Sequence, residues 1–266
     1  SEQLEAWATT IRKDVVQMVA RHGQGYVQQG LGAADLFTYL YFQELRFDRM
    51  DCDWPDRDRF ILSTAHNTAV FYATLARAGL IDPGKLTDYC IDGTPFEINA
   101  SERLAPFVEC TCGSLGQGLS VAAGLAMGLK RQERNSNVYL MLGDGELEEG
   151  QIWEAAMAAS YHQANNLRVI VDRNRIQNDN FVEEQMRVGD IASKFRSFGW
   201  NIIEIDGHDM NDILAGLFEA KASVEPTAIV AATVKGKGVS FMEDNPAFHG
   251  AAPNAEQFAK AMEELS

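Results

Sequence analysis

Two short apolar segments, residues 138–142 and 168–172, constrain the fold of this chain more than any other feature. Each has the length and composition of a buried parallel strand, and residues 151–165 between them carry apolar side chains at helical spacing. Parallel strands that are joined by a helix place their carboxyl ends at the same edge of a sheet. We therefore expect Asp144 and Asn174, which follow the two strands, to lie close together.

The rest of the chain alternates between segments of the same two kinds. A further strand is expected to end at Ser63, and others to span residues 201–205 and 228–234. Helices are expected over residues 4–22, 33–45, 119–131, 191–198, 213–223 and 255–265. A length of 266 residues suits one large domain with a sizeable core. The alternation predicts an α/β domain with a parallel sheet.

The composition argues against several classes of partner. The formal net charge of −15 disfavours binding to nucleic acids and to anionic membrane surfaces, and an anionic ligand would need a local cation. The chain has four cysteines and no Cys-x-x-Cys pair, so reduced thiols are expected. No signal peptide and no apolar run of membrane length is recognisable, which predicts a cytoplasmic protein.

The residues after the two strands have the chemistry of a magnesium site. The Asp144 carboxylate, the Asn174 amide and a nearby backbone carbonyl are hard oxygen ligands, which Mg²⁺ prefers and often shares with phosphate oxygens. Glycines flank Asp144, so backbone N–H groups can approach an anion at the start of the following helix. The alternative interpretation is an ordinary turn between a strand and a helix.

The segment from Gly143-Asp144-Gly145 to Asp172-Arg173-Asn174 resembles the thiamine-diphosphate fingerprint, and residues 4–265 are similar to the amino-terminal half of transketolases. The resemblance implies a parallel central sheet with helices on both faces. It also implies that residues 1–266 form a single pyrophosphate-binding domain whose cofactors are thiamine diphosphate and Mg²⁺. The implied metal ligands are Asp144, the side chain of Asn174 and the carbonyl of Ile176.

The resemblance also assigns roles to individual residues. The implied cofactor-binding residues are His66, Gly113, Leu115, Gly143, Asp144, Gly145, Glu146, Asn174, Ile176 and His249. His66 and His249 are further expected to contact substrate hydroxyls and to move protons. Glu149 and Glu154 fall where transketolases carry carboxylates that link paired active sites, and they complete the candidate catalytic set. The alternative for these two glutamates is that they are solvated acids at a helix start.

The chain departs from the family pattern at two places. The family His in a Gly-His-Pro-Gly loop aligns with Tyr26, and Gly93-Thr94-Pro95 occupies the region of a second substrate-facing His. We therefore expect the substrate to differ from an ordinary pentose phosphate, or another group to bind it. Two other loops are expected to be structural: residues 206–209 as a turn and helix cap, and residues 235–238 as a flexible basic turn.

The chain matches only one half of a transketolase. In the family, the Glu that engages the aminopyrimidine ring lies on a second, pyrimidine-binding domain. We therefore expect a separate chain to supply that domain and an α2β2 heterotetramer with a sugar as substrate, unless the sequence is part of a longer polypeptide. The expected reaction is transfer of a two-carbon ketol unit from a ketose or ketose phosphate to an aldehyde. The alternatives are transfer to a lipoyl or carrier-protein thiol, as in 2-oxo acid dehydrogenase first components, and a non-catalytic assembly subunit.

Overall fold

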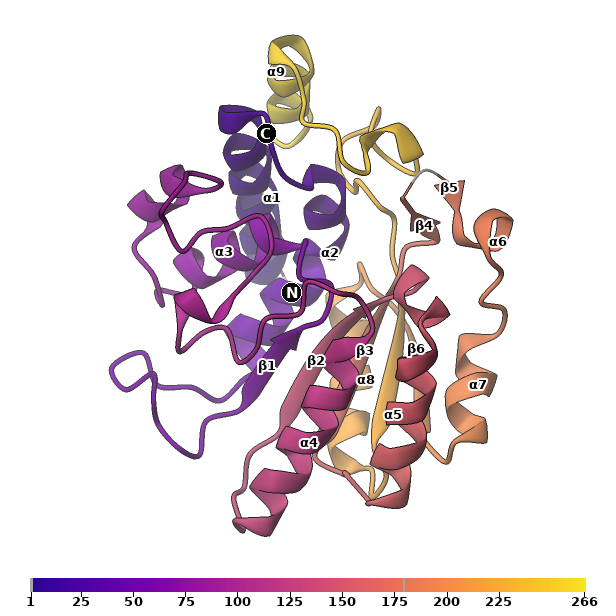
Figure 1. Cartoon of the computed structure of the whole chain (residues 1–266). Helices are drawn as coiled ribbons and strands as arrows, with labels where there is room; N and C mark the ends of the chain where they lie inside the picture. Colours follow the sequence, from indigo (N-terminus) through magenta and orange to yellow (C-terminus); the bar gives the residue numbers. More distant parts are fainter. Residues whose placement is uncertain (1, 179) are drawn as a thin grey trace.

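A computed structural model of the chain describes residues 2–178 and 180–266, and a parallel sheet forms its centre (Figure 1). The strands pair in the order β1-β2-β3-β7-β6, and every neighbouring pair is parallel. They are β1 (Arg59–Leu62), β2 (Val138–Gly143), β3 (Leu167–Arg173), β6 (Asn201–Asp206) and β7 (Thr227–Ala232). The predicted α/β fold with a parallel central sheet is confirmed.

Alternation along the strands creates two hydrophobic cores, one on each face of the sheet. On β2, Tyr139 and Met141 belong to one core, whereas Val138, Leu140 and Leu142 belong to the other. Successive side chains of a strand point to opposite faces, so a strand that is apolar throughout must be covered on both sides. This explains why the strand segments are continuous apolar runs.

Helices cover both faces of the sheet. The first core is closed by α1 (Glu2–His22), α2 (Val27–Tyr39), α3 (Thr68–Arg77), α8 (Met210–Ala222) and α9 (Ala255–Glu264). The second is closed by α4 (Gln117–Arg131), α5 (Gly150–Tyr161) and α7 (Ile191–Ser197). Figure 1 shows α4 and α5 side by side across that face. Short pieces complete the described chain: a π-helical turn at 40–44, 3-10 turns at 83–88, 102–104, 145–148 and 246–248, the hairpin β4 (Ile176–Gln177) and β5 (Asn180–Phe181), and α6 (Val182–Gln185).

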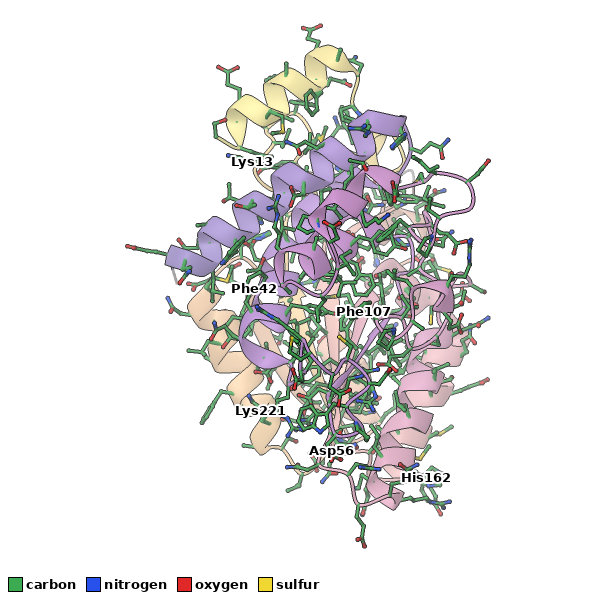
Figure 2. The ribbon with its side chains drawn as sticks, turned by 90° about the vertical axis from the view of Figure 1, so that its left-hand side faces the viewer. Lys13, Phe42, Asp56, Phe107, His162 and Lys221 are labelled. Atoms are coloured by element: carbon green, nitrogen blue, oxygen red, sulfur yellow. The ribbon has the colours of Figure 1, made fainter. Side chains whose placement is uncertain are left out.

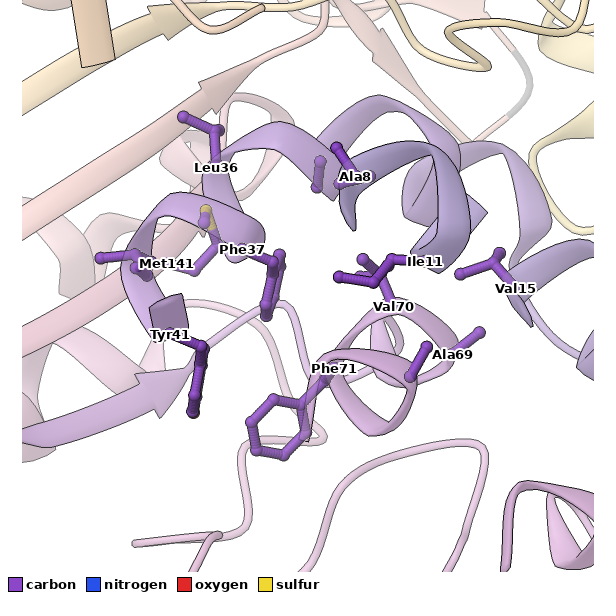
Figure 3. Packing of buried hydrophobic residues seen from close by; sticks show 14 of the residues in the cluster. Ala8, Ile11, Val15, Leu36, Phe37, Tyr41, Ala69, Val70, Phe71 and Met141 are labelled. Carbon is purple, nitrogen blue, oxygen red and sulfur yellow. The ribbon is translucent and has the colours of Figure 1, made fainter. Parts of the chain in front are cut away.

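Aromatic side chains pack α2 and the turn after it against α3. Phe37 of α2 lies 6.3 Å from Phe71 of α3 between ring centroids, and Tyr41 lies 6.2 Å from the same ring. Figure 3 shows these rings beside Ile11 of α1 and Met141 of β2. Aromatic pairs at such distances add about 0.5–1.5 kcal/mol to the free energy of burial. The packing therefore joins α2 to α3 in the core on one face of the sheet.

Several helix boundaries differ from the expected ones. The second helix was expected to start at residue 33, but α2 starts at Val27. Gly32 explains the error, because a Cβ at this position would lie 3.0 Å from the carbonyl oxygen of Val234, so the glycine allows close packing of a helix rather than a loop. The helix after β2 was expected to reach residue 165, but α5 ends at Tyr161, since Gln163 adopts a positive φ of 53° that a helix does not allow.

The two ends of the sheet differ in character. In the side view of Figure 2, Asp56, His162 and Lys221 lie at the end of the molecule opposite α9. These residues precede β1, β3 and β7 in the sequence, so this is the end where the strands begin. The loops that follow the strands lie at the other end. Within the described part of the chain, no helix has the length and apolar character needed to cross a membrane.

Candidate functional site

A cleft with a volume of about 450 Å³ opens at the carboxyl edge of the sheet. Residues that follow four of the five strands line it, together with the start of α2 and the loop before α4. In open α/β sheets, ligands bind in the crevice outside the carboxyl ends of the strands. All ten predicted cofactor-binding residues line this cleft. The structure therefore brings the predicted site together, and its occupation by the cofactor stays a prediction.

Asp144 is held rigidly at the end of β2. Its carboxylate accepts hydrogen bonds from the backbone N–H of Gly145 at 2.9 Å and from that of Arg175 at 2.5 Å. Only 3% of the residue is exposed. Burial, with the neighbouring Asp172 carboxylate as the next cause, raises the pKa of Asp144 to about 7. The backbone after β3 thus helps to position Asp144, in line with the prediction that the ends of the two strands lie close together.

Asn174 is oriented by its neighbours after β3. Its Nδ2 donates to the carboxylate of Asp172 at 3.0 Å, and its Oδ1 accepts from the backbone N–H of Ile176 at 3.1 Å. Asp172 is buried and also accepts a hydrogen bond from the hydroxyl of Thr233, and burial raises its pKa. Asp172 was not among the predicted site residues, although it lies two residues before Asn174 and lines the cleft.

Lys235 is the third charged group at the base of the cleft. Its ammonium donates to the carbonyl of Ile176 at 2.9 Å and to Nδ1 of His249 at 2.9 Å. The residue is 2% exposed, and burial lowers its pKa to about 8. The turn predicted at residues 235–238 is present, but the sequence did not indicate that Lys235 is buried in it. The available signal was that Lys235 follows a buried strand closely, as Asp144 follows β2.

The donor set fits a divalent cation. Asp144 and Asp172 are both buried, and Lys235 is the buried cation that faces them. Two carboxylates with one ammonium leave an excess of negative charge that a divalent ion would neutralise. In the described ranges, no group of three or more His, Cys, Asp or Glu side chains is placed to hold a metal. The predicted ligand set, one carboxylate with the amide of Asn174 and the carbonyl of Ile176, is not such a group, and metal binding here stays a prediction.

Three rings form the outer wall of the cleft. The ring centroids of Tyr26 and His66 are 5.0 Å apart, those of Tyr26 and His249 are 5.7 Å apart, and those of the two histidines are 6.2 Å apart. Burial, followed by the charge of Lys235, lowers the pKa of His66 to about 4 and that of His249 to about 3. Both imidazoles are therefore neutral at neutral pH, so each can donate and accept one hydrogen bond.

The turn after β2 contains a glycine, Gly145, against which the side chain of Gln177 packs closely. A Cβ at Gly145 would lie 2.7 Å from Cβ of Gln177, so no larger residue fits there. Glu146 accepts hydrogen bonds from the Ser63 hydroxyl, from the N–H of Gly116 at 2.7 Å and from that of Gly143 at 3.2 Å. Its carboxylate thus ties together the ends of β1 and β2 and the start of α4, and burial raises its pKa.

Of the remaining predicted residues, Glu154 alone lies outside the cleft wall. Gly113 and Leu115 lie in the loop before α4 and line the cleft; Gly113 is exposed, and no described atom lies within 4 Å of a Cβ built on it. Glu149 is exposed and also lines the cleft. Glu154 is exposed on α5 and is not part of the cleft wall. The role predicted for the two glutamates at an interface between chains stays a prediction.

Three cleft residues that the sequence did not single out have polar atoms without partners. Both side-chain polar atoms of Gln29, Oγ1 of Thr64 and Oδ1 of Asn67 are buried and make no hydrogen bond within the described structure. All three residues line the cleft, and Gln29 is 4% exposed. Buried polar groups normally pair with protein, water or ligand atoms, so these atoms are available to water or to a polar ligand in the cleft. Thr64 and Asn67 flank the predicted His66 closely, whereas Gln29 had no local signal.

Comparison with known proteins gives one consistent family. The family model described as transketolase, thiamine diphosphate binding domain, matches residues 4–266. The chain is 35% identical over 263 residues to the 6-deoxy-6-sulfo-D-fructose transketolase subunit SqwG of Clostridium sp. (strain MSTE9), with 98% of this chain and 96% of that protein covered. It is 34% identical over 272 residues to one of the subunits of the apulose-4-phosphate transketolase of Phocaeicola vulgatus, with 100% and 94% covered.

The structural comparison shows how much of a full transketolase the chain represents. The crystal structure of transketolase from Campylobacter jejuni superposes with a TM-score of 0.94 at 29% identity. The alignment covers 100% of this chain and 43% of that chain. The chain therefore has the fold of less than half of that enzyme and about the full length of the two relatives named as subunits.

Proposed function

Because the chain belongs to the transketolase family, of which it is the thiamine-diphosphate-binding part, we propose that it is one subunit of a split transketolase. The proposed reaction is transfer of a two-carbon ketol unit from a ketose or ketose phosphate to an aldehyde. The observation that carries the proposal is the convergence of Asp144, Asn174 and the Ile176 carbonyl in one cleft at the ends of β2 and β3.

The proposed metal is Mg²⁺. Asp144, Oδ1 of Asn174 and the carbonyl of Ile176 would hold it, and phosphate oxygens would complete its shell. The Ile176 carbonyl already accepts a hydrogen bond from Lys235, but a carbonyl oxygen has two lone pairs and retains acceptor capacity. The glycines at Gly143 and Gly145 leave room for a diphosphate beside the metal.

When bound, thiamine diphosphate supplies the electron sink that allows a carbon–carbon bond next to a carbonyl to be broken. The residues of this chain provide binding and proton transfer. Glu146 holds the turns around Gly116 and Gly143 that form the cleft wall. Both imidazoles are neutral, so His66 can hold a substrate hydroxyl and accept or return its proton. Nδ1 of His249 accepts from Lys235, so His249 would donate through Nε2 to a substrate oxygen.

The proposed donor is a hydroxylated ketose, bound partly by residues other than histidine. Tyr26 stands against both histidines, and Gln29 offers an unpaired amide in the same wall. The relatives named above are described as transketolase subunits, which favours ketol transfer over transfer to a lipoyl or carrier-protein thiol. The intact cluster of Asp144, Asp172 and Asn174 favours a catalytic subunit over one that serves assembly alone.

The proposed partner is a second polypeptide with the pyrimidine-binding part of the enzyme, in an α2β2 assembly. Glu149 and Glu154 would lie at the contact between subunits. The cytoplasmic location predicted from the sequence is retained in this proposal.

The deciding experiment purifies the chain with the polypeptide that accompanies it and assays a panel of ketoses with thiamine diphosphate and Mg²⁺. Transfer is expected for the pair and absent when the partner, the cofactor or the metal is omitted. Turnover by the isolated chain would contradict the split enzyme, and a preference of the pair for 2-oxo acids over every ketose would contradict the reaction.

A further inference from the structure

Two cysteines lie side by side directly before the cleft wall. The Sγ atoms of Cys110 and Cys112 are 3.3 Å apart, and only Thr111 separates the two residues in sequence. Both are free thiols; Cys110 is half-buried, whereas Cys112 is 1% exposed. Gly113, which follows Cys112, lines the cleft. The proposed reaction uses neither thiol, so the pair calls for a separate explanation.

We propose that Cys110 and Cys112 form a redox-active dithiol, which a peroxide converts into an intramolecular disulfide, and that this closure weakens binding of thiamine diphosphate in the adjoining cleft. The first part stands on the geometry of the two thiols. The second part rests on the proposed function.

The two cysteines differ in the way that such a reaction requires. Cys110 is the one accessible to solvent, and its hydrogen bond with Cys112 lowers the pKa of the Cys110 thiol. The same hydrogen bond and burial raise the pKa of Cys112. The thiolate is the reactive form of cysteine, so Cys110 is the nucleophile and Cys112 is the resolving thiol.

The chemistry balances with a peroxide as the only co-reactant. The Cys110 thiolate attacks one peroxide oxygen, the O–O bond breaks, and with hydrogen peroxide the second oxygen leaves as water after protonation. Cys112 then attacks the sulfenic sulfur of Cys110, the S–O bond breaks, and a second water leaves. Two thiols lose two electrons and two protons in total, and the peroxide is reduced to two molecules of water.

Closure must displace the cleft wall. A disulfide bond is about 2.05 Å long, so the two Sγ atoms have to approach by more than an ångström. Cys112 belongs to the same hydrophobic core as Leu119 and Ala122 of α4, and close-packed cores transmit small shifts. The backbone from Gly113 to Gly116, which Glu146 ties to the end of β2, lies directly after it. The disulfide is therefore expected to disturb the wall that Gly113 and Leu115 form.

The first experiment tests the disulfide itself. A variant with Cys52→Ser and Cys90→Ser retains only the pair and is treated with hydrogen peroxide, followed by thiol titration and peptide mass spectrometry. We expect loss of both thiols, a mass decrease of about 2 Da in the peptide that spans the pair, and full recovery with dithiothreitol. Persistence of both thiols, a disulfide between two chains, or a sulfinic acid at Cys110 would each overturn the proposal. Wild-type protein, analysed in the same way, covers the case in which the variant is unstable.

The second experiment measures cofactor binding by calorimetry, with Mg²⁺ present and the partner chain bound. Oxidised wild-type protein is expected to bind thiamine diphosphate at least fivefold more weakly than reduced protein, with recovery after dithiothreitol. Cys110→Ser protein should bind with the same affinity before and after peroxide. Equal affinities of oxidised and reduced wild-type protein overturn the second part. If reduced protein binds no cofactor, the proposed function fails and the second part falls with it, while the thiol measurements still decide the first part.

Discussion

The ammonium of Lys235, at the end of β7, donates a hydrogen bond of 2.9 Å to the carbonyl of Ile176, which follows β3. Because these strands are neighbours in the sheet, a cation reaches a carbonyl that is also the third proposed metal ligand. Lys235 thereby places positive charge beside the buried Asp144 and Asp172. The interaction links the electrostatics of the cleft to the packing of the sheet.

Replacing Asp144 by Ala should weaken Mg²⁺-dependent binding of thiamine diphosphate by at least about a hundredfold, because the only charged ligand of the proposed metal site is lost. Calorimetry with and without Mg²⁺ measures the effect. Asp92→Ala, at an exposed loop position, is the control and should bind like wild type. An affinity of Asp144→Ala equal to that of the control would falsify the metal site.

Replacing Lys235 by Met should destabilise the protein by about 3 kcal/mol, because Asp144 and Asp172 lose their buried counter-charge and the Ile176 carbonyl loses its donor. Lys237→Met, two residues along the same loop, is the control and should cost less than about 0.5 kcal/mol. Urea unfolding gives both values. If the two variants unfold at the same urea concentration, Lys235 has no electrostatic role in the fold.

Acidification should destabilise the cofactor-free protein through its histidines. The pKa of His249 is lowered to about 3, so the unfolded state takes up a proton as the pH falls below about 6.5 while the folded state does not. The contribution of His249 to the free energy of unfolding is therefore fully present above pH 6.5 and decreases as the pH falls towards 3. Between pH 7 and pH 5 the decrease is about 2 kcal/mol.

The measurement compares urea unfolding of wild type and His249→Gln from pH 7 to pH 5. The pKa of Asp144 is raised to about 7, so its protonation stabilises the folded protein as the pH falls, opposite to the effect of His249. The effect of the histidine is therefore obtained only from the difference between the two proteins. The variant should lose about 2 kcal/mol less than wild type. Parallel stability curves for the two proteins would mean that His249 is protonated equally in both states.

Replacing Gln29 by Met should have opposite effects on stability and on substrate binding. Both polar atoms of the buried amide are unpaired, so their removal should stabilise the protein by about 1 kcal/mol. The KM for the ketose should rise about tenfold with little change in kcat, since one hydrogen bond to the substrate is lost. Gln17→Met, at an exposed site on α1, should change neither quantity. A lower stability of Gln29→Met would show that the amide already has a partner in the folded protein.

Much of the fold follows from local patterns. The apolar runs at 138–142 and 168–172 predicted the two central strands, and their polar ends predicted that Asp144 and Asn174 would meet. The helix expected from residue 255 starts there, since the Asn254 side chain accepts from the N–H of Gln257 and caps α9. The turn and helix cap expected at 206–209 are also confirmed, because the Asp209 side chain caps α8. These features depend on residues that are close in sequence.

The sequence alone therefore determined the parallel sheet, the identity of the loops at its carboxyl edge and the residues that those loops present. The tertiary structure decided that Lys235 is buried against Ile176, that the amide of Gln29 enters the cleft unpaired, and that the thiols of Cys110 and Cys112 touch. The physical reason is that periodicity reports the local backbone conformation and which face is apolar. Burial and pairing of a side chain depend on groups that the chain brings together from distant positions, and a one-dimensional pattern does not contain that information.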